Sequence, residues 1–375
     1  MRVLLLAGRF EVRGSSRQTL NLLDHLPERG HEVEVICLDA SRVSSIRRSG
    51  GDIREIRALD WPLVGRTARP LLLLSWLRDP PDLIHIQGAE MHRIGRWLAK
   101  RSRRPYVLTV HRQPTVRDSL RMHRRWGRGF VATTEPIRDA LLQNPHVDAG
   151  LVRMVRNGVA AAGQDGVAQD RTILAPGRRP VVGTAGPLES GKGLHHFLRA
   201  IPHILASGPV ANWPEGGPEF LVAGAGPEER PLRQLARDLG ISSRVTFFSN
   251  LFDFAESLAA MDIFVLPSER PGMAVTMLEA MGSGIAVVST DIGRAGSEVE
   301  NGRTGLLIPP GDSEAIATQV SALLQDPMRA RRIAAAGQRL VRERYPLANM
   351  LDDIVEVYED AVAEAPAIAG SIGAA

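Results

Sequence analysis

Short apolar runs alternate with segments of helical hydrophobic spacing along most of the chain. Arg2 to Gly8 is the first such run, and Arg17 to Arg29 then carries leucines at helical spacing. Runs of β-branched residues and leucine between helices indicate parallel sheets that helices cover on both faces. The further strands predicted in this half of the chain are His31 to Asp39, Ile53 to Leu59, Asp82 to Gln87, Tyr106 to His111 and Phe130 to Thr134.

The alternation stops at Ala160 to Arg179, a stretch rich in Gly, Ala and Gln that is typical of a linker, and then restarts. The pattern therefore predicts two doubly wound, Rossmann-like α/β domains, residues 1–165 and 166–345, facing each other across a cleft. A helix over residues 346–363 is expected to pack back on the first domain, and the tail 364–375 to be disordered. The strands predicted in the second domain are Val181 to Thr184, Phe220 to Ala223, Val245 to Phe248, Ile263 to Leu266, Ala286 to Ser289 and Gly305 to Ile308.

The composition is that of a globular protein. Of the 375 residues 44% are hydrophobic and 23% charged, which excludes a disordered or fibrous chain. The sequence contains no run of 18 consecutive apolar residues, the length that a membrane-spanning helix needs. The first residues fit a buried strand better than a signal peptide. The single cysteine, Cys37, excludes an intrachain disulfide and a cysteine-based metal cluster and fits a reducing, cytoplasmic setting.

Charge is distributed unevenly. Residues 1–160 hold 28 basic and 16 acidic residues, a net charge of +12, whereas residues 161–375 hold 18 and 26, a net charge of −8. Arg93 to Arg128 has 12 basic residues and one acid, and it includes Trp97 and Trp126. That combination suits peripheral contact with an anionic membrane surface; a solvated arginine-rich surface is the alternative. No nucleic-acid recognition motif accompanies it, so no nucleic-acid partner is expected.

Only two of the 46 basic residues are lysines, and one of them, Lys192, lies between two glycines. The run Gly186 to Gly193 follows a predicted strand and resembles a phosphate-binding loop, but Gly193 stands where such a loop needs a hydroxyl for magnesium. A P-loop enzyme is therefore disfavoured, while a lysine that meets a phosphate at a helix start is retained. Gly224-Ala225-Gly226 is interpreted as a tight strand-to-helix turn.

The segment Asp262 to Gly284 carries the most information. A strand ends at Pro267-Ser268, and a loop with Gly272 opens a helix. The amides of Met273, Ala274 and Val275 in its first turn form an anion site that suits a diphosphate. Glu279 follows about two turns into this helix, where a carboxylate can accept hydrogen bonds from vicinal sugar hydroxyls.

This segment is similar to the signature of the retaining GT-B glycosyltransferases, in particular glycosyltransferase family 4 (group 1). The similarity covers Pro267-Ser268, Gly272 and the run Glu279-Ala-Met-Gly-Ser-Gly284. Matches in the same order extend over nearly the whole chain. They are Gly14, Asp82-Leu-Ile-His85-Ile-Gln-Gly88, Thr109-Val-His111, Asn157-Gly-Val159, Gly186-Pro-Leu with Lys192-Gly193, and Asn301-Gly-Arg-Thr-Gly-Leu-Leu307.

The resemblance implies the GT-B fold and a retaining, metal-independent sugar transfer from a UDP- or GDP-sugar, without a cofactor. The acceptor, a lipid-linked or small molecule, would dock on the first domain during polysaccharide, glycolipid or glycoconjugate synthesis. The resemblance also implies one role for each matching residue. Lys192 and the amides of residues 272–275 would hold the diphosphate, Gly14 would lie near it, Glu279 would bind the ribose, Ser249 and Asn250 would lie by the nucleobase, and His111 would lie near the transferred sugar.

Three positions depart from the family pattern. Pro187 replaces an arginine that precedes the lysine, Pro271 replaces the first glutamate of the pair that ends in Glu279, and Arg13 replaces the first of two glycines. Two alternatives therefore stay open. One is a non-catalytic GT-B scaffold or regulatory partner, and the other is a sugar-nucleotide epimerase of the same architecture.

Overall fold

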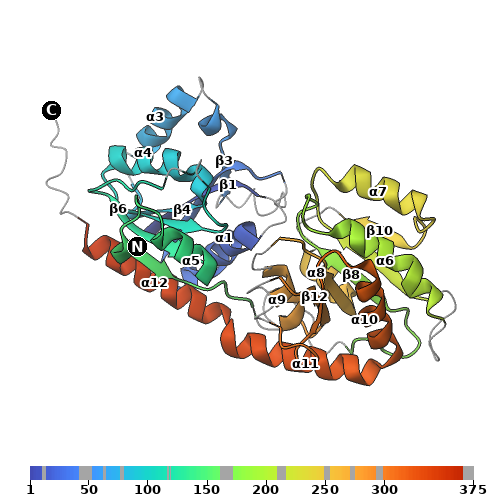
Figure 1. Cartoon of the computed structure of the whole chain (residues 1–375). Coiled ribbons are helices and arrows are strands. Elements are labelled where there is room, and N and C mark those ends of the chain that lie inside the picture. The colour runs from blue at the N-terminus through green and yellow to red at the C-terminus, as the bar shows by residue number, and fades with distance from the viewer. Residues whose placement is uncertain are drawn as a thin grey trace, which may run out of the picture. The chain divides into compact units, whose positions relative to one another are not determined.

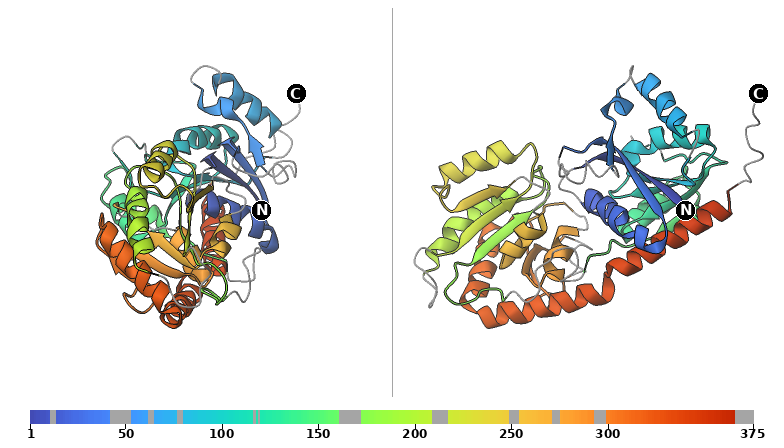
Figure 2. Two further views of the ribbon diagram at one scale, coloured as in Figure 1. Left: turned by 90° about the vertical axis from the view of Figure 1, so that its right-hand side faces the viewer. Right: turned by 180° about the vertical axis from the view of Figure 1, so that it is seen from behind.

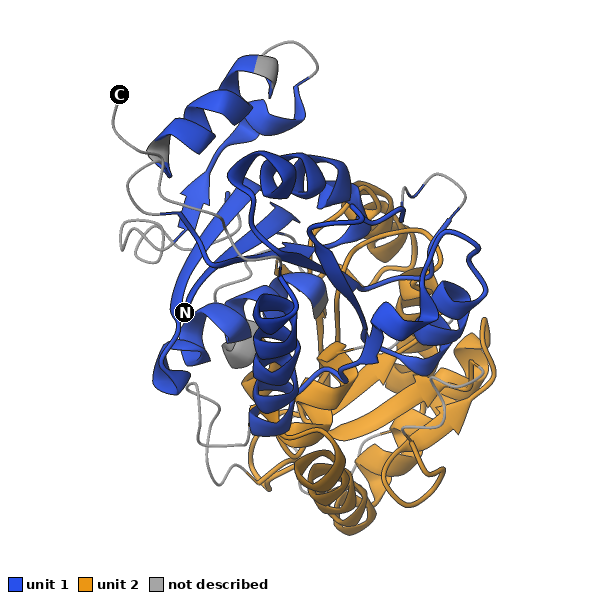
Figure 3. Ribbon diagram, turned by 90° about the vertical axis from the view of Figure 1, so that its left-hand side faces the viewer, with its two compact units in different colours: residues 1–10, 14–158, 348–375 blue, residues 11–13, 159–347 orange. Residues whose placement is uncertain are grey.

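The computed structural model describes residues 1–10, 14–41, 53–61, 65–76, 80–115, 118, 120–160, 172–208, 217–248, 254–270, 275–292 and 299–365. The chain forms two compact units (Figure 3). Unit 1 comprises residues 1–10, 14–158 and 348–375, and unit 2 comprises residues 11–13 and 159–347. The predicted boundary between residues 165 and 166 lies outside the described residues. The same holds for residues 366–375 of the tail 364–375 that was predicted to be disordered.

Unit 1 is built on a parallel sheet of seven strands in the order β3-β2-β1-β4-β5-β6-β7 (Figure 1). Every residue of β4 and β5 is buried, as expected for central strands covered on both faces. Strand β7 is absent from the predicted set, and the strand predicted from Ile53 ends early because a 3₁₀ helix follows it. The strands are Arg2–Arg9 (β1), Glu32–Asp39 (β2), Ile53–Glu55 (β3), Leu83–Gln87 (β4), Tyr106–Val110 (β5), Gly127–Ala132 (β6) and Val152–Met154 (β7).

Helices of unit 1 include α12, which lies beside α1 although the two are more than 300 residues apart in the chain (Figure 2, right). The Gln18 amide approaches Met350 Sδ at 3.8 Å, and Arg29 pairs with Asp352 at 2.8 Å. The α-helices are Gly14–His25 (α1), Gly65–Ser75 (α3), His92–Ser102 (α4), Glu135–Leu142 (α5) and Leu347–Ala363 (α12). The 3₁₀ helices are Pro27–Arg29 (η1), Arg57–Asp60 (η2), Ala89–Met91 (η3) and Ala149–Leu151 (η4).

Unit 2 is built on a second parallel sheet, with six strands in the order β10-β9-β8-β11-β12-β13. The prediction of two doubly wound α/β domains is therefore confirmed. The strands are Val181–Ala185 (β8), Glu219–Ala223 (β9), Val245–Phe248 (β10), Ile263–Leu266 (β11), Ala286–Thr290 (β12) and Leu306–Ile308 (β13). The helices are Leu194–Ala206 (α6), Glu229–Asp238 (α7), Phe254–Ala260 (α8), Val275–Gly282 (α9), Ser313–Gln325 (α10) and Pro327–Arg344 (α11).

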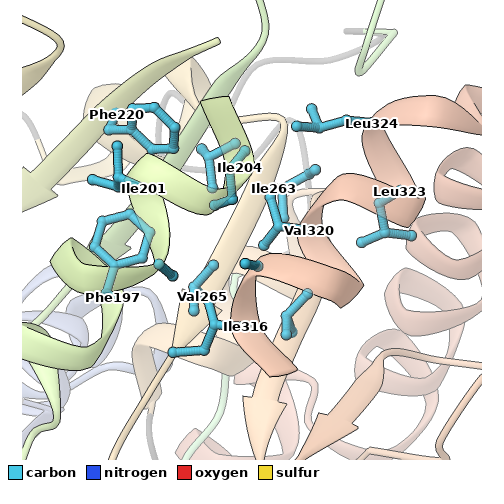
Figure 4. Packing of buried hydrophobic residues seen from close by; sticks show 14 of the residues in the cluster. Phe197, Ile201, Ile204, Phe220, Ile263, Val265, Ile316, Val320, Leu323 and Leu324 are labelled. Atoms are coloured by element: carbon cyan, nitrogen blue, oxygen red, sulfur yellow. The ribbon is translucent and has the colours of Figure 1, made fainter. Parts of the chain in front are cut away.

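Two helices of unit 2, α6 and α10, pack together over one face of its sheet. Figure 4 shows Phe197 and Ile204 of α6, Ile316 and Val320 of α10 and Val265 of β11 in one cluster. Burial of each such side chain contributes about 1.5–3 kcal/mol. This packing fixes the start of α6, and with it the preceding loop that carries Lys192.

A buried carboxylate fastens the segment before β8 to unit 2. Asp262, which precedes β11, is fully buried and accepts hydrogen bonds from the amides of Leu174 (2.9 Å) and Val181 (2.8 Å). It also forms an ion pair with Arg178. These partners compensate the cost of taking the carboxylate out of water, so residues 174–181 belong structurally to unit 2.

The strand order reverses once in each sheet, between β1 and β4 in unit 1 and between β8 and β11 in unit 2. In open α/β sheets, ligands bind beyond the carboxyl ends of the two strands at such a reversal, because the connections that follow them leave in opposite directions. In unit 2, the loops at this position are the one with Lys192, after β8, and Pro267 to Arg270, after β11.

A buried hydrogen bond joins α12 to the sheet of unit 1. Tyr358 is fully buried, and its hydroxyl lies 2.6 Å from Nδ1 of His85 on β4, which is also fully buried. Both groups are therefore satisfied without water.

We expect Tyr358→Phe to lower the free energy of unfolding by about 1 kcal/mol, because the change removes a buried hydrogen bond of the His85 ring. Urea unfolding followed by circular dichroism measures the difference. Asp360→Asn, at an exposed position of the same helix, is the matched control and should stay within about 0.5 kcal/mol of the wild type. Equal stability of Tyr358→Phe and the control would contradict the buried bond.

Candidate active site

The loop that carries Lys192 lies directly on the end of the neighbouring strand. Gly193 has φ of 64°, and a Cβ atom there would lie 1.8 Å from the carbonyl oxygen of Pro267. No side chain fits at this position, so the glycine lets two loops meet backbone to backbone. As predicted, Lys192 stands between a strand and a helix, β8 and α6.

The loop after β11 is held in place by two further hydrogen bonds. The Glu269 amide donates to Gly191 O at 2.9 Å, and the Thr290 hydroxyl donates to Ser268 O at 2.7 Å. Ser268 and Thr290 are both buried. Residues 271–274 lie outside the described residues, so the predicted amides of Gly272, Met273 and Ala274 cannot be placed; Val275 is the first residue of α9.

Glu279 lies in the middle of α9 and is only 9% exposed. Its carbonyl oxygen accepts hydrogen bonds from the amide and the hydroxyl of Ser283, at 2.9 and 2.8 Å. A solvated helix glutamate is therefore excluded. A carboxylate at a buried position of a helix requires polar partners, because burial removes it from water.

The turn Gly224-Ala225-Gly226, which follows β9, has a packing role. A Cβ atom at Gly224 would lie 1.9 Å from Gly186 O, and one at Gly226 would lie 2.3 Å from Leu188 O. The Leu188 amide donates to Ala225 O at 3.0 Å. This geometry agrees with the interpretation as a tight turn, whose glycines support the Lys192 loop from the other side. The predicted nucleobase residues Ser249 and Asn250 lie outside the described residues.

One group among the described side chains could hold a metal ion. The ligand atoms of His195, His196 and Glu269 lie within 4.8 Å of one another. His196 Nε2 is 2.8 Å and His195 Nε2 is 3.5 Å from Glu269 Oε1. Pairing of the imidazoles with the carboxylate explains this closeness without an ion, and it ties the start of α6 to the loop after β11. These three residues were not predicted as a site from the sequence.

In unit 1, His111 follows β5 directly, and its Nε2 lies 3.2 Å from Gln87 Oε1 at the end of β4. Burial lowers the pKa of His111 to about 4 and that of the neighbouring His85 to about 3. Both imidazoles are therefore neutral near pH 7. The predicted Gly14 is the first residue of α1, and the loop before it lies outside the described residues.

The structure corrects part of the prediction for Arg93 to Arg128. Trp126 is only 5% exposed because it packs in the core of unit 1, so it cannot enter a membrane interface. Trp97 is half-buried against the same core, with the Arg101 guanidinium 5.7 Å from its ring. The exposed residues of this stretch include Arg93, Lys100, Arg101, Arg103, Arg121, Arg124 and Arg125. None of the helices in the described part of the chain is both long and apolar enough to cross a bilayer.

Two family models match the chain, one in each half. "Glycosyltransferase Family 4" matches residues 12–162, and "Glycosyl transferases group 1" matches residues 179–326. The chain belongs to the group 1, family 4 glycosyltransferases of the GT-B fold. In this family context, the Lys192 loop and Glu279 fall within the second matched segment, and Gly14 and His111 within the first.

Relatives in the family differ in their substrates. The chain is 29% identical over 297 residues to glycogen synthase of Mycobacterium tuberculosis, an alignment that covers 77% of this chain and 64% of that protein. It is 26% identical over 379 residues to phosphatidyl-myo-inositol mannosyltransferase of Mycobacterium leprae, which covers 93% and 94% of the two chains. The chain thus spans 64% of the length of the glycogen synthase that it matches.

Solved structures show the same fold. HepE of Anabaena, in complex with UDP-glucose, superposes with a TM-score of 0.74 at 21% identity, over 96% of this chain and 99% of that one. A glycosyltransferase from Rickettsia africae gives a TM-score of 0.75 at 19% identity, over 97% and 99%. These likenesses confirm the predicted GT-B fold class.

The neutral state of His85 and His111 predicts a loss of stability in acid. Both folded-state pKa values lie below the unfolded value of about 6.5, so the unfolded chain takes up protons first as the pH falls. The free energy of unfolding should fall from pH 6.5 toward pH 4, by about 2 kcal/mol at pH 5 for His85 alone. NMR titration of the imidazole Cε1–H signals, checked by urea unfolding at each pH, tests this. A midpoint near pH 6.5 for His85 would contradict its buried, neutral state.

Proposed function

We propose that this protein is a retaining glycosyltransferase that moves a sugar from a UDP- or GDP-sugar to an acceptor, without a metal ion. The observation that carries the proposal is the contact of the Lys192 loop with the loop after β11, at the reversal of the strand order in unit 2. This geometry holds the ammonium-bearing loop at the position where open α/β sheets bind phosphate-containing ligands.

The difficult part of the reaction is departure of the nucleoside diphosphate. Its charge grows as the bond to the sugar breaks, so positive charge fixed in advance at the β-phosphate stabilises the transition state. Lys192 supplies this charge in the proposal, together with the amides at the start of α9. The arginine that the family has before the lysine is Pro187 here, so Lys192 takes a larger share of the stabilisation.

Glu279 binds the ribose of the donor in this proposal. A buried carboxylate accepts hydrogen bonds from two vicinal hydroxyls more strongly than water-exposed groups do, because no water competes for it. The nucleobase would lie by Ser249 and Asn250, Gly14 near the diphosphate, and His111 near the transferred sugar. Because His111 is neutral near pH 7, it acts through hydrogen bonding and not through a full positive charge.

The names of the relatives suggest which donors and acceptors to test first. UDP-glucose is the first donor to test, because HepE is solved with it, and GDP-sugars are the second. The mannosyltransferase of Mycobacterium leprae acts, by its name, on a phosphatidylinositol, so a lipid-linked acceptor is included. Polysaccharide, glycolipid and glycoconjugate synthesis all use such donors.

We expect Lys192→Ala to lower kcat/KM by roughly 100- to 1000-fold, as loss of one group that stabilises a leaving group does in other enzymes. Glu279→Ala should weaken nucleotide binding by about 10- to 100-fold. Nucleotide release with and without acceptor measures the first, and thermal shift with UDP and GDP the second. Arg237→Ala, which removes an exposed charge from α7 of the same unit, should match the wild type.

The same assay separates the remaining alternatives. Nucleotide binding without release under any acceptor supports the non-catalytic scaffold that Pro187 and Pro271 suggest. Isomerisation of the donor without acceptor supports an epimerase. Full activity of both Lys192→Ala and Glu279→Ala would refute the proposed site.

The exposed arginines of Arg93 to Arg128 predict binding to anionic lipid, through charge and without Trp126. We expect sedimentation with vesicles that contain phosphatidylglycerol and none with pure phosphatidylcholine, because each basic residue near the surface contributes about 1 kcal/mol. Arg93→Glu with Arg124→Glu should reduce this binding at least 10-fold, while Arg332→Glu with Arg339→Glu, exposed on α11, should not. Equal binding to both kinds of vesicle would exclude this surface.

A further inference from the structure

A continuous set of polar contacts connects α12 with His111 inside unit 1. His85 lies at its centre, with Nδ1 2.6 Å from the Tyr358 hydroxyl and Nε2 2.6 Å from the Thr109 hydroxyl. Gln87 Nε2 lies 3.2 Å from both ring nitrogens of His85, and Gln87 Oε1 lies 3.2 Å from His111 Nε2. Tyr358, His85, Thr109 and Gln87 are all buried.

The structure places the nitrogen of the Gln87 amide toward His85 and its oxygen toward His111. The two hydroxyls occupy both ring nitrogens of His85, and a neutral imidazole has one donor and one acceptor, so one hydroxyl donates and the other accepts. The equal 3.2 Å distances bring the Gln87 NH₂ group to the ring without taking either of these bonds. The amide oxygen then faces His111.

This orientation fixes the proton of His111. An amide oxygen only accepts hydrogen bonds, so Nε2 of His111 must be the donor. The neutral ring carries one proton, and Nδ1 therefore keeps its lone pair. The backbone of Gln87 is held as well, because β4 pairs with β5 at Thr109 and with β1 at Ala7.

We propose that Gln87 is a positioning residue that holds His111 as the Nε2–H tautomer, so that Nδ1 accepts a hydrogen bond from a hydroxyl of the sugar substrate. This role rests on the proposed function, in which His111 lies near the transferred sugar. The role of His111 is then that of an acceptor that orients a hydroxyl. Tyr358 supports the arrangement from α12 by holding His85.

Two-bond ¹H–¹⁵N correlation spectra of the apoprotein at pH 7.5 reveal the tautomer directly. In the wild type we expect His111 to show the Nε2–H pattern. Gln87→Met, which keeps the length of the side chain and removes the acceptor, should give averaged nitrogen shifts. Gln87→Glu, which keeps an acceptor oxygen, should retain the Nε2–H pattern. A wild-type Nδ1–H pattern, or an unchanged pattern in Gln87→Met, would overturn the proposal, and the wild-type spectrum needs no variant to fold.

Kinetics test the positioning role. Gln87→Met should lower kcat about 10-fold with the nucleotide thermal shift preserved, and Gln87→Glu should recover most of this loss. Full activity in Gln87→Met despite an altered tautomer would overturn the positioning role. An inactive wild type with the expected spectrum would instead refute the proposed function and support the tautomer assignment, so the two failures are distinguishable.

Discussion

The contact between Gly193 and Pro267 is the constraint on which the arrangement of the loops after β8 and β11 in unit 2 depends. Strands β8 and β11 are neighbours, so the loops that follow them must share the space beyond one short edge of the sheet. They do so because position 193 has no side chain, and an amide–carbonyl bond between Glu269 and Gly191 then joins them. Backbone packing thus determines where the loop with Lys192 lies in the fold, without any contribution from a ligand.

Unit 1 presents a different kind of order, based on polar groups in a dry interior. Histidine, tyrosine, threonine and glutamine side chains meet between β4, β5 and α12, and hydrogen bonds among them replace those with water. Loss of one member of such a buried network lowers the stability of the fold, because it leaves a polar group unpaired. When all members are present, their hydrogen bonds favour a single arrangement of the side chains. It links a helix near one end of the chain to a residue that follows β5, nearly 250 positions earlier.

The fold could be predicted well because parallel strands buried on both faces leave an unmistakable pattern of apolar runs. The failures were short or irregular elements: β7 has three residues and no buried one, and β3 gives way to a 3₁₀ helix at Arg57. Lys192 and Glu279 could be singled out because one is a rare residue between glycines and the other begins the run Glu279-Ala-Met-Gly-Ser-Gly284 of a recognisable segment.

The rest of the site depends on contacts that no local pattern contains. Gln87 meets His111 only through the register of β4 against β5, and His196 meets Glu269 across 73 residues of sequence. Trp126 was wrongly assigned to the surface because it stands among arginines, although it directly precedes β6 and packs in the core of unit 1. Contacts between residues so distant in sequence, and the burial of a tryptophan among arginines, become visible only in the folded structure.

Asp262 determines where this chain can be joined to the first half of a related protein. Its carboxylate gathers Leu174, Arg178 and Val181, so the last part of the inter-unit connection is built into the second half. A chimera that joins a foreign first half at residue 181 would replace Leu174 and Arg178, two of the three partners of this buried carboxylate. A junction placed before residue 172 keeps Leu174, Arg178 and Val181 with Asp262, so it is the better place to join the two halves.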